Sequence, residues 1–328
     1  MPFAGICVSY LLRNDGVVVC FGSYCDEIRT LGNTDRGMTF KQVSSGGEHV
    51  LLLRTDGRVM GCIIDVPLQF RSPQAEAGVI YLQVSAGFDD SLLLKNDGRV
   101  VAQGSNWFGE CDIPETESGV IYTQISGGYK YSLLLRSDGR VVACGLHGRR
   151  QRIIPEPEVG VRYTQVFAGF QHSLLLRSDG KVVVLGTNRH GECNIPEPKA
   201  GVRYIQVSAG MSHSLLLRND GQVVACGSND SGQCNTPDPG IGMFYTAVSA
   251  GDLHSLLLRS DGMVVACGEN RFGQCNIPEL DAGRKYVSTS VLPIGNVVLQ
   301  IEVQHGAMKL CNSLGCCQLR DTGKAWSV

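Results

Sequence analysis

Short apolar runs recur along this chain, and each is bounded by glycine or by charged residues. A run such as "HSLLLR" (213–218) is too short for a helix and ends in turn residues, so it predicts a β-strand. Its three adjacent leucines break the alternation expected of a strand with one wet face, which predicts burial on both faces. An Asp-Gly pair and a second apolar run, "QVVACG", follow, and they predict a β-hairpin with a type I′ turn.

This unit recurs every 41 residues in seven copies without an insertion. The Asp-Gly pairs mark the interval, and they begin at Asp15, Asp56, Asp97, Asp138, Asp179, Asp220 and Asp261. A unit of this kind cannot bury both faces of its strands alone, so the copies must pack against one another. The pattern predicts an all-β fold of four-stranded antiparallel blades in a radial array, which leaves only short, protected edges.

The two ends of the repeat array fit together. The first copy lacks its initial strand, and "KYVSTS" (285–290) repeats that strand alone at the other end. We expect this late strand to complete blade 1, because closure removes two exposed sheet edges. The predicted organisation is therefore a seven-bladed propeller over residues 1–290 and a C-terminal β-hairpin tail over residues 291–328.

Composition narrows the possible partners. Charged residues make up 18% of the chain, its formal net charge is −2 and its pI is about 6.4. This balance gives no general attraction to nucleic acid or to an anionic membrane. No secretory signal and no membrane-spanning apolar run are visible, so we expect a cytoplasmic or nuclear monomer with reduced thiols.

The sequence shows no constellation that would carry catalysis. His49, His172, His213 and His254 share one repeat column, but equivalent positions on different blades lie too far apart for one zinc ion. We expect these histidines to hydrogen-bond a loop backbone. Neither a P-loop nor a G-x-S-x-G or H-E-x-x-H motif is present. We therefore expect no enzyme, no metal and no cofactor.

Eight of the 14 cysteines recur in two columns, which hold Cys62, Cys144, Cys226 and Cys267, and Cys111, Cys193, Cys234 and Cys275. Other residues also occur in both columns, so we interpret these cysteines as small apolar fillers. An alternative is a disulfide across a hairpin, between Cys226 and Cys234 or between Cys267 and Cys275.

Strand parity assigns the loops to two faces. The Asp-Gly hairpins and the proline-rich linkers share one face, whose charges balance and which we interpret as structural. The other face varies between copies and carries aromatic and arginine residues, which are enriched at binding hot spots. We predict that a protein partner binds there, through Phe88, Asp89, Trp107, Phe108, Tyr129, Lys130, Arg149, Arg150, Phe170, Arg189, Met211, Arg271 and Phe272. Within this face "HGRRQR" (147–152) forms a basic segment that would suit an acidic partner.

The composite motif "AGxxHSLLLRxDGxVVACGxNxxGQCxIP" resembles the repeat of the regulator of chromosome condensation family over residues 1–290. The resemblance implies a seven-bladed β-propeller. The short, regular copies are similar to those of dinoflagellate repeat proteins and of a secreted β-lactamase-inhibiting propeller. The tail faintly resembles the opening hairpin of a ubiquitin-like domain, which would make it a remnant of one.

The best functional interpretation is a non-catalytic scaffold that binds a protein partner through the variable face. One alternative is an adaptor or substrate-recognition component of ubiquitin-ligase machinery. A second is a guanine-nucleotide exchange factor for a small GTPase. The constant spacing of the Asp-Gly pairs argues against the second, because the exchange factor of this family uses an inserted hairpin.

Overall fold

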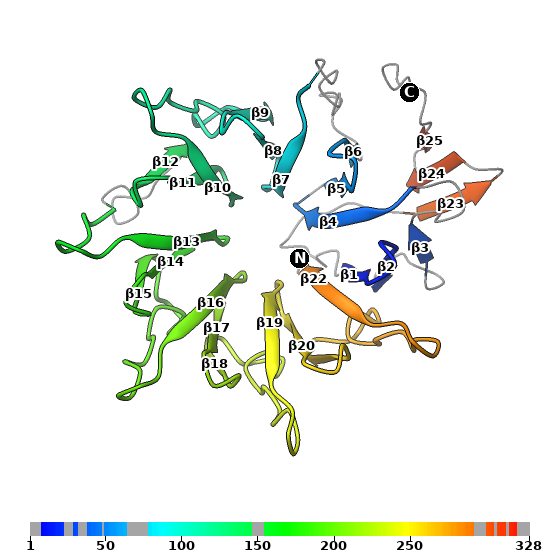
Figure 1. Ribbon diagram of the computed structural model, residues 1–328. Helices are drawn as coiled ribbons and strands as arrows, with labels where there is room; N and C mark the ends of the chain where they lie inside the picture. Colours follow the sequence, from blue (N-terminus) through cyan, green and yellow to red (C-terminus); the bar gives the residue numbers. More distant parts are fainter. Residues whose placement is uncertain are drawn as a thin grey trace.

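The structure is a computed structural model of the chain. It describes residues 8–22, 29–31, 38–47, 49–63, 78–145, 154–291, 300–304, 307–312 and 315–319. In these ranges the regular secondary structure consists of β-strands, and seven sheets stand as blades around a common centre (Figure 1). The predicted all-β propeller with seven blades is confirmed.

Blade 1 is built from both ends of the repeat array. Its four strands lie in the order β22 (Tyr286–Val291), β1 (Val8–Arg13), β2 (Val18–Gly22) and β3 (Arg29–Leu31). Strand β22 pairs antiparallel with β1. The predicted closure by a late strand is therefore confirmed.

The other six blades each contain a three-stranded antiparallel sheet, with the strands in chain order from the centre outward (Figure 1). Blades 2 to 4 are β4 (Phe40–Ser45), β5 (His49–Arg54), β6 (Val59–Ile63); β7 (Tyr81–Ala86), β8 (Asp90–Lys95), β9 (Val100–Gly104); and β10 (Tyr122–Gly127), β11 (Tyr131–Arg136), β12 (Val141–Gly145). Blades 5 to 7 are β13 (Tyr163–Ala168), β14 (His172–Arg177), β15 (Val182–Gly186); β16 (Tyr204–Ala209), β17 (His213–Arg218), β18 (Val223–Gly227); and β19 (Tyr245–Ala250), β20 (His254–Arg259), β21 (Val264–Gly268).

A separate three-stranded sheet follows the propeller. It contains β23 (Gln300–Gln304), β24 (Ala307–Asn312) and β25 (Gly315–Leu319), paired antiparallel in that order. The division of the chain at residue 290 and the kinship of the tail with ubiquitin-like domains stay predictions.

In blades 3 and 5 to 7 the structure describes three hydrogen-bonded strands rather than the four expected. In blade 3 the segment after β9 forms a turn at Gly109–Asp112, and Ile113 N donates to Cys111 O within the same segment. Pro114 follows, and proline has no N–H to give to a ladder. The same arrangement recurs in blades 5 to 7. In these blades no ladder joins the fourth segment to the third strand in the described parts. The segment still contributes to the core, because Ile113, Ile195 and Ile277 pack against inter-blade clusters.

The leucine column shows why the blades stack. Every leucine of the triple runs in β5, β8, β11, β14, β17 and β20 is at most 5% exposed. In β17, Leu215 and Leu217 pack with Tyr245 of blade 7, whereas Leu216 packs with Leu174 of blade 5. Successive side chains of one strand therefore enter two different inter-blade cores, as predicted from the loss of alternation.

The Asp-Gly hairpins form, but their turns are not of type I′. Arg54 N donates to Arg58 O and Gly57 N donates to Arg54 O, which leaves a three-residue loop of Thr55, Asp56 and Gly57. Only the glycine has a positive φ, of 81° at Gly57. This is a type I turn followed by a left-handed glycine, the common three-residue hairpin. The loop is one residue longer than the type I′ prediction allows.

Candidate functional site

The predicted division of the loops between two faces is confirmed by hydrogen bonds between loops. In blade 3 Ser105 N, in the outer turn, donates to Asp89 O in the inner loop at 2.9 Å. The same bond joins the outer turn to the inner loop in blades 5, 6 and 7. On the opposite face, Ser137 N of a hairpin donates to Ile121 O of a linker at 2.8 Å. We call the first surface the variable face and the second the hairpin face.

Glycines bring the blades together where the inner strands end at the centre. The residue after each central glycine donates its N–H to the central glycine of the next blade. These bonds are Gly47 to Gly87, Phe88 to Gly128, Tyr129 to Gly169, Phe170 to Gly210 and Met211 to Gly251, at 3.0 to 3.4 Å. A Cβ on Gly210 would lie 2.2 Å from Gly251 O, so glycine is required by close approach of backbones. The loops around the centre are therefore held rigidly.

Three predicted site residues form an aromatic cluster at the centre of the variable face. The rings of Tyr129 and Phe170 lie 4.3 Å apart, and Phe88 meets Tyr129 edge-on at 4.8 Å. All three side chains are half-buried. They come from consecutive blades 3, 4 and 5, and each follows a central glycine. Ring pairs in such geometries add about 0.5–1.5 kcal/mol beyond area burial.

Lys130 extends the aromatic cluster toward the rim. Its ammonium lies 4.8 Å from the ring centroids of both Tyr129 and Phe108. Its φ is 63°, and Lys130 is the one non-glycine residue with a positive φ in the described parts of the chain. That conformation costs roughly 1–2 kcal/mol. Two cation–π contacts of about 0.5–1 kcal/mol each offset the cost.

Phe108 and Trp107 complete a radial strip on the outer turn of blade 3. Phe108 is 42% exposed and Trp107 is 87% exposed. The turn itself is rigid, because the buried Glu110 accepts hydrogen bonds from Phe108 N and Ser105 Oγ, both at 2.8 Å. We define the aromatic strip as Phe170, Phe88, Tyr129, Lys130, Phe108 and Trp107. A rigid, exposed strip of this kind can bind a partner with little loss of conformational entropy.

Acidic groups lie beside the aromatic strip. Asp89 is half-buried, and burial raises the pKa of its carboxyl, although the charge of Lys130 acts in the opposite direction. Asp90 is buried, its carboxylate accepts a long hydrogen bond of 3.4 Å from Ser132 Oγ, and burial raises its pKa well above the ordinary value. Neither Asp90 nor Glu110 was predicted from the sequence to belong to this environment. Most other copies have histidine at the position of Asp90 and glutamine at the position of Glu110. These departures from the repeat were the signal in the sequence that blade 3 is more acidic here.

The remaining predicted site residues are dispersed over the variable face. Met211 is half-buried at the centre, and Arg189 is exposed on the outer turn of blade 5. On blade 7 Arg271 pairs with Glu269 at 3.7 Å, and Phe272 is half-buried. Neither ring contacts nor cation–π contacts join these four to the aromatic strip in the described structure. Arg149, Arg150 and the rest of the 147–152 segment lie outside the described residues.

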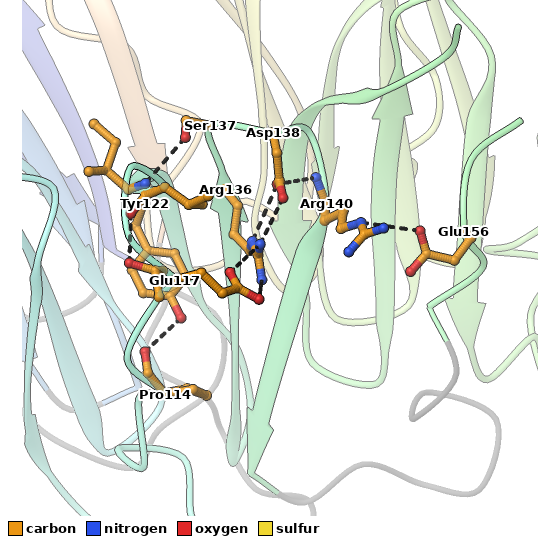
Figure 2. Close-up of polar contacts among 11 residues, drawn as sticks. Pro114, Glu117, Tyr122, Arg136, Ser137, Asp138, Arg140 and Glu156 are labelled. Carbon is orange, nitrogen blue, oxygen red and sulfur yellow. Dashed lines mark hydrogen bonds and ion pairs between the residues drawn. The ribbon is translucent and has the colours of Figure 1, made fainter. Parts of the chain in front are cut away.

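The hairpin face is organised by repeated ion pairs, as the sequence predicts. Arg136 bridges Asp138 of its own hairpin at 2.7 Å and Glu117 of the preceding linker at 2.6 Å (Figure 2). The Tyr122 hydroxyl donates to Pro114 O at 2.8 Å, which fixes the other end of that linker (Figure 2). The Tyr–Pro bond recurs in four later copies. These contacts hold hairpins and linkers in place.

The histidine column is structural, but its partners are not the loop backbones that we expected. Each histidine contacts the serine of the next blade through Nε2, at 2.8 to 3.0 Å, and His254 reaches Ser9 across the closure. Ser214 and Ser255 already donate to Glu192 O and Gln233 O, so they accept from the histidine. The imidazoles of His172 and His213 are therefore neutral with the proton on Nε2. No group of residues in the described ranges is arranged to hold a metal ion.

The column cysteines whose side chains the structure describes have free thiols. Cys226, Cys234, Cys267 and Cys275 are among the free cysteines, so neither disulfide alternative is formed. Burial raises the pKa of Cys275 to about 12, and its Sγ donates to Glu269 O at 3.2 Å. None of the described segments is a helix of the length and apolar character that a membrane crossing requires.

Comparisons with known proteins agree with this architecture. The regulator of chromosome condensation (RCC1) repeat matches residues 163–192, 204–233 and 245–274. Among solved structures, yeast RCC1 (Prp20) bound to Kap60 is 18% identical, with 98% of this chain and 91% of that chain covered and a TM-score of 0.64. Prp20p from Saccharomyces cerevisiae, studied for its binding to Gsp1p and histones, is 18% identical, with coverages of 98% and 93% and a TM-score of 0.65.

Human WBSCR16 is 17% identical, with 87% of this chain and 94% of that chain covered and a TM-score of 0.60. No curated protein sequence matches the chain. At these identities the likeness to solved structures concerns the fold alone. The repeat match and the seven closed blades together bear out the resemblance that the sequence motif indicated.

Proposed function

We propose that this chain, a seven-bladed propeller of regulator of chromosome condensation repeats, is a non-catalytic scaffold that binds a protein partner through its variable face. The observation that carries the proposal is the aromatic strip. It places Trp107 and Phe108 in solvent on a rigid turn and joins Phe108 through Lys130 to the aromatic cluster. Exposed aromatic residues on a pre-ordered frame are typical of interaction hot spots. A cytoplasmic or nuclear location is part of the proposal.

The contrast between the two faces supports this choice. On the hairpin face an arginine two residues before the aspartate of the Asp-Gly pair forms an ion pair with that aspartate in six copies. Two of these arginines, Arg136 and Arg177, also pair with linker glutamates. Such exposed pairs contribute about 0–1 kcal/mol each and recur in nearly every copy, so they carry little specificity. The variable face differs from blade to blade, which a selective binding surface requires.

The test is affinity capture with the intact chain and two variants. We expect Trp107→Ala with Phe108→Ala to lose its partner, since hot-spot truncations cost about 2 kcal/mol or more, which is roughly 30-fold in affinity. The matched control is Ile241→Ala with Met243→Ala, which removes exposed apolar side chains from the hairpin face. The proposal is wrong if the hairpin-face variant loses the partner and the strip variant retains it. Melting curves establish that both variants fold.

Two alternative roles can be tested with the same purified chain and the proteins that it captures. Ubiquitin ligases among the captured proteins would favour an adaptor in ubiquitination. Accelerated nucleotide release from a small GTPase would favour an exchange factor. We expect no release, because the hairpins that the structure describes are all three-residue loops with no inserted wedge.

A further inference from the structure

We infer that the aromatic strip binds an acidic segment of a partner protein, in which a carboxylate pairs with Lys130 between apolar or aromatic side chains. This inference rests on the proposed function and specifies the chemistry of the partner. It begins from Lys130, which stands in the middle of the strip and is half-buried. The rings of Tyr129 and Phe170 lie on its inner side, and Phe108 with its neighbour Trp107 lies on its outer side.

Lys130 has unused bonding capacity. An ammonium group has three donors, and the two cation–π contacts give those donors no oxygen acceptor from the described residues. Within the described part of the chain, neither an ion pair nor a side-chain hydrogen bond engages its Nζ. Asp89 is near enough for the two charges to interact, but the pair is not in contact. A carboxylate from outside is the group that would complete this site.

The backbone at Lys130 indicates that the position of the ammonium is specifically maintained. A left-handed φ at a lysine is unfavourable, and such outliers tend to occur at binding sites. The equivalent residues in the neighbouring blades, Asp89 and Gln171, do not share it. The left-handed conformation of Lys130 accompanies a side chain that reaches from the inner loop of blade 4 to the outer turn of blade 3.

The same geometry disfavours a basic partner. Aromatic rings attract cations through their faces, and an empty cluster of rings would bind a lysine or arginine of a partner. Here Lys130 already lies against Tyr129 and Phe108, so a second cation would meet its charge at short range in a partly dry environment. Apolar and aromatic side chains remain suitable for Phe170 and for the highly exposed Trp107.

Because the partner is unidentified, the probe is a phage-displayed library of random peptides of about 12 residues, selected against the immobilised full chain. We expect a consensus with an aspartate or glutamate flanked by aromatic or aliphatic residues. The consensus peptide is then synthesised, and its affinity for the chain and its variants is measured by fluorescence anisotropy. A version of the peptide with lysine in place of the acid accompanies it.

Charge variants should change the affinity for an acidic peptide and for a basic peptide in opposite directions. Lys130→Glu should lower the affinity for the acidic peptide by about ten-fold or more, and it should allow the lysine peptide to bind. Asp89→Asn should strengthen the acidic peptide by roughly two- to three-fold, because it removes a like charge. Lys130→Gly, which suits the left-handed backbone, should weaken binding with no loss of thermal stability, so a folding defect cannot imitate the result.

Two controls lie outside the aromatic strip. Gln171→Glu introduces a negative charge at the position equivalent to Lys130. Phe244→Ala removes an exposed aromatic ring from a linker on the hairpin face. Neither should change affinity beyond about two-fold, a difference well below that expected for one interfacial charge pair. A basic or uncharged consensus that still loses affinity in Phe108→Ala would overturn the acidic partner and leave the binding face intact. No selected peptide, or peptides equally sensitive to Gln171→Glu, would also overturn the inference. If the partner is then captured normally by Trp107→Ala with Phe108→Ala, the proposed function fails as well.

Discussion

At the scale of single residues, the most informative feature is the hydrogen bond between each column histidine and the serine of the next blade. Ser9, Ser214 and Ser255 donate to backbone carbonyls, so their partners His254, His172 and His213 must donate from Nε2. The Nδ1 atoms of His172, His213 and His254 then have no hydrogen-bond partner in the described structure. Protonation would bury a charge with no acceptor, and burial accordingly lowers the pKa of His213 to about 3.

This arrangement predicts acid destabilisation. Burial lowers the pKa of His49 and His172 to about 4 and that of His254 to about 3, all below the ordinary value of 6.5. The unfolded chain therefore takes up protons first, so the stabilisation is complete above pH ~6.5 and is lost as the pH falls toward 4. At pH ~5 each histidine costs roughly 2 kcal/mol of the free energy of unfolding.

The comparison of His213→Gln with the natural chain isolates one such group. Urea unfolding at pH ~7 and ~5 should show a loss of stability about 2 kcal/mol smaller in the variant. His190→Gln, on the exposed outer turn of blade 5, is the control substitution. The comparison between variants matters because the buried Asp90, whose pKa is raised, responds to pH in the opposite direction. Equal pH dependence in His213→Gln would contradict the lowered pKa of His213.

Residue-level outcomes show what sequence reasoning can reach. The repeat register identified the histidines as structural, because the column also holds valine, aspartate and tyrosine. It could not identify the serine partner, since that contact crosses to another blade about 42 residues away. The left-handed backbone of Lys130 was equally out of reach, because lysine has no intrinsic preference for it. The sequence did place Phe88, Tyr129 and Phe170 on one face, but not their ring contacts.

At the scale of elements, the hairpins show how one residue type fixes a turn. The glycine of every Asp-Gly pair has a φ between 77° and 85°. At Gly221 an added Cβ would also lie 2.3 Å from the Cβ of Phe244, because the linker crosses directly over the hairpin. The sequence identified the hairpin through Asp-Gly, whereas the turn type depended on whether the preceding residue belongs to the loop.

Two glycine substitutions separate backbone strain from steric exclusion. Gly201 has a φ of 81° but no atom within 4 Å of an added Cβ, so Gly201→Ala should cost about 1 kcal/mol from backbone strain alone. Gly221→Ala adds the clash with Phe244 and should cost roughly 2–4 kcal/mol. Thermal unfolding of both variants checks the difference. Equal losses of stability in the two variants would show that the linker at Phe244 moves away from the added methyl group at no cost in free energy.

The fourth segment of blades 3, 5, 6 and 7 marks the limit of strand prediction. Its turn and its isoleucine were recognisable, and Ile113 does pack against the inter-blade core of blades 3 and 4. Whether such a segment joins the ladder depends on backbone hydrogen bonds, and proline removes one of the donors that pairing would need. The pattern of apolar and polar residues alone does not show whether the fourth segment hydrogen-bonds to the third strand.

At the scale of the whole molecule, closure converts a row of blades into a ring. Strand β22 supplies Tyr286, which is 2% exposed and packs with Leu11 and Phe21 of blade 1 and with Leu256 and Leu258 of blade 7. Two further contacts cross the same junction, from His254 to Ser9 and from Asn14 N to Lys285 O. The sequence predicted this closure from a missing strand at one end and an extra strand at the other.

The stability of the ring therefore depends on β22, the last strand of the repeat array. Deleting residues 285–328 should expose the edge of β1 and the core around Leu256, and should cost at least about 4 kcal/mol, as loss of one buried aromatic side chain does. For a domain of this size that corresponds to a melting temperature lower by about 10 °C. Deleting residues 292–328 keeps β22 and is the matched control, which should melt within a few degrees of the full chain. Tyr286→Ala in the full chain should reproduce most of the loss without removing any backbone. If the shorter deletion and the longer one destabilise the propeller equally, the contribution assigned to β22 belongs to the tail instead.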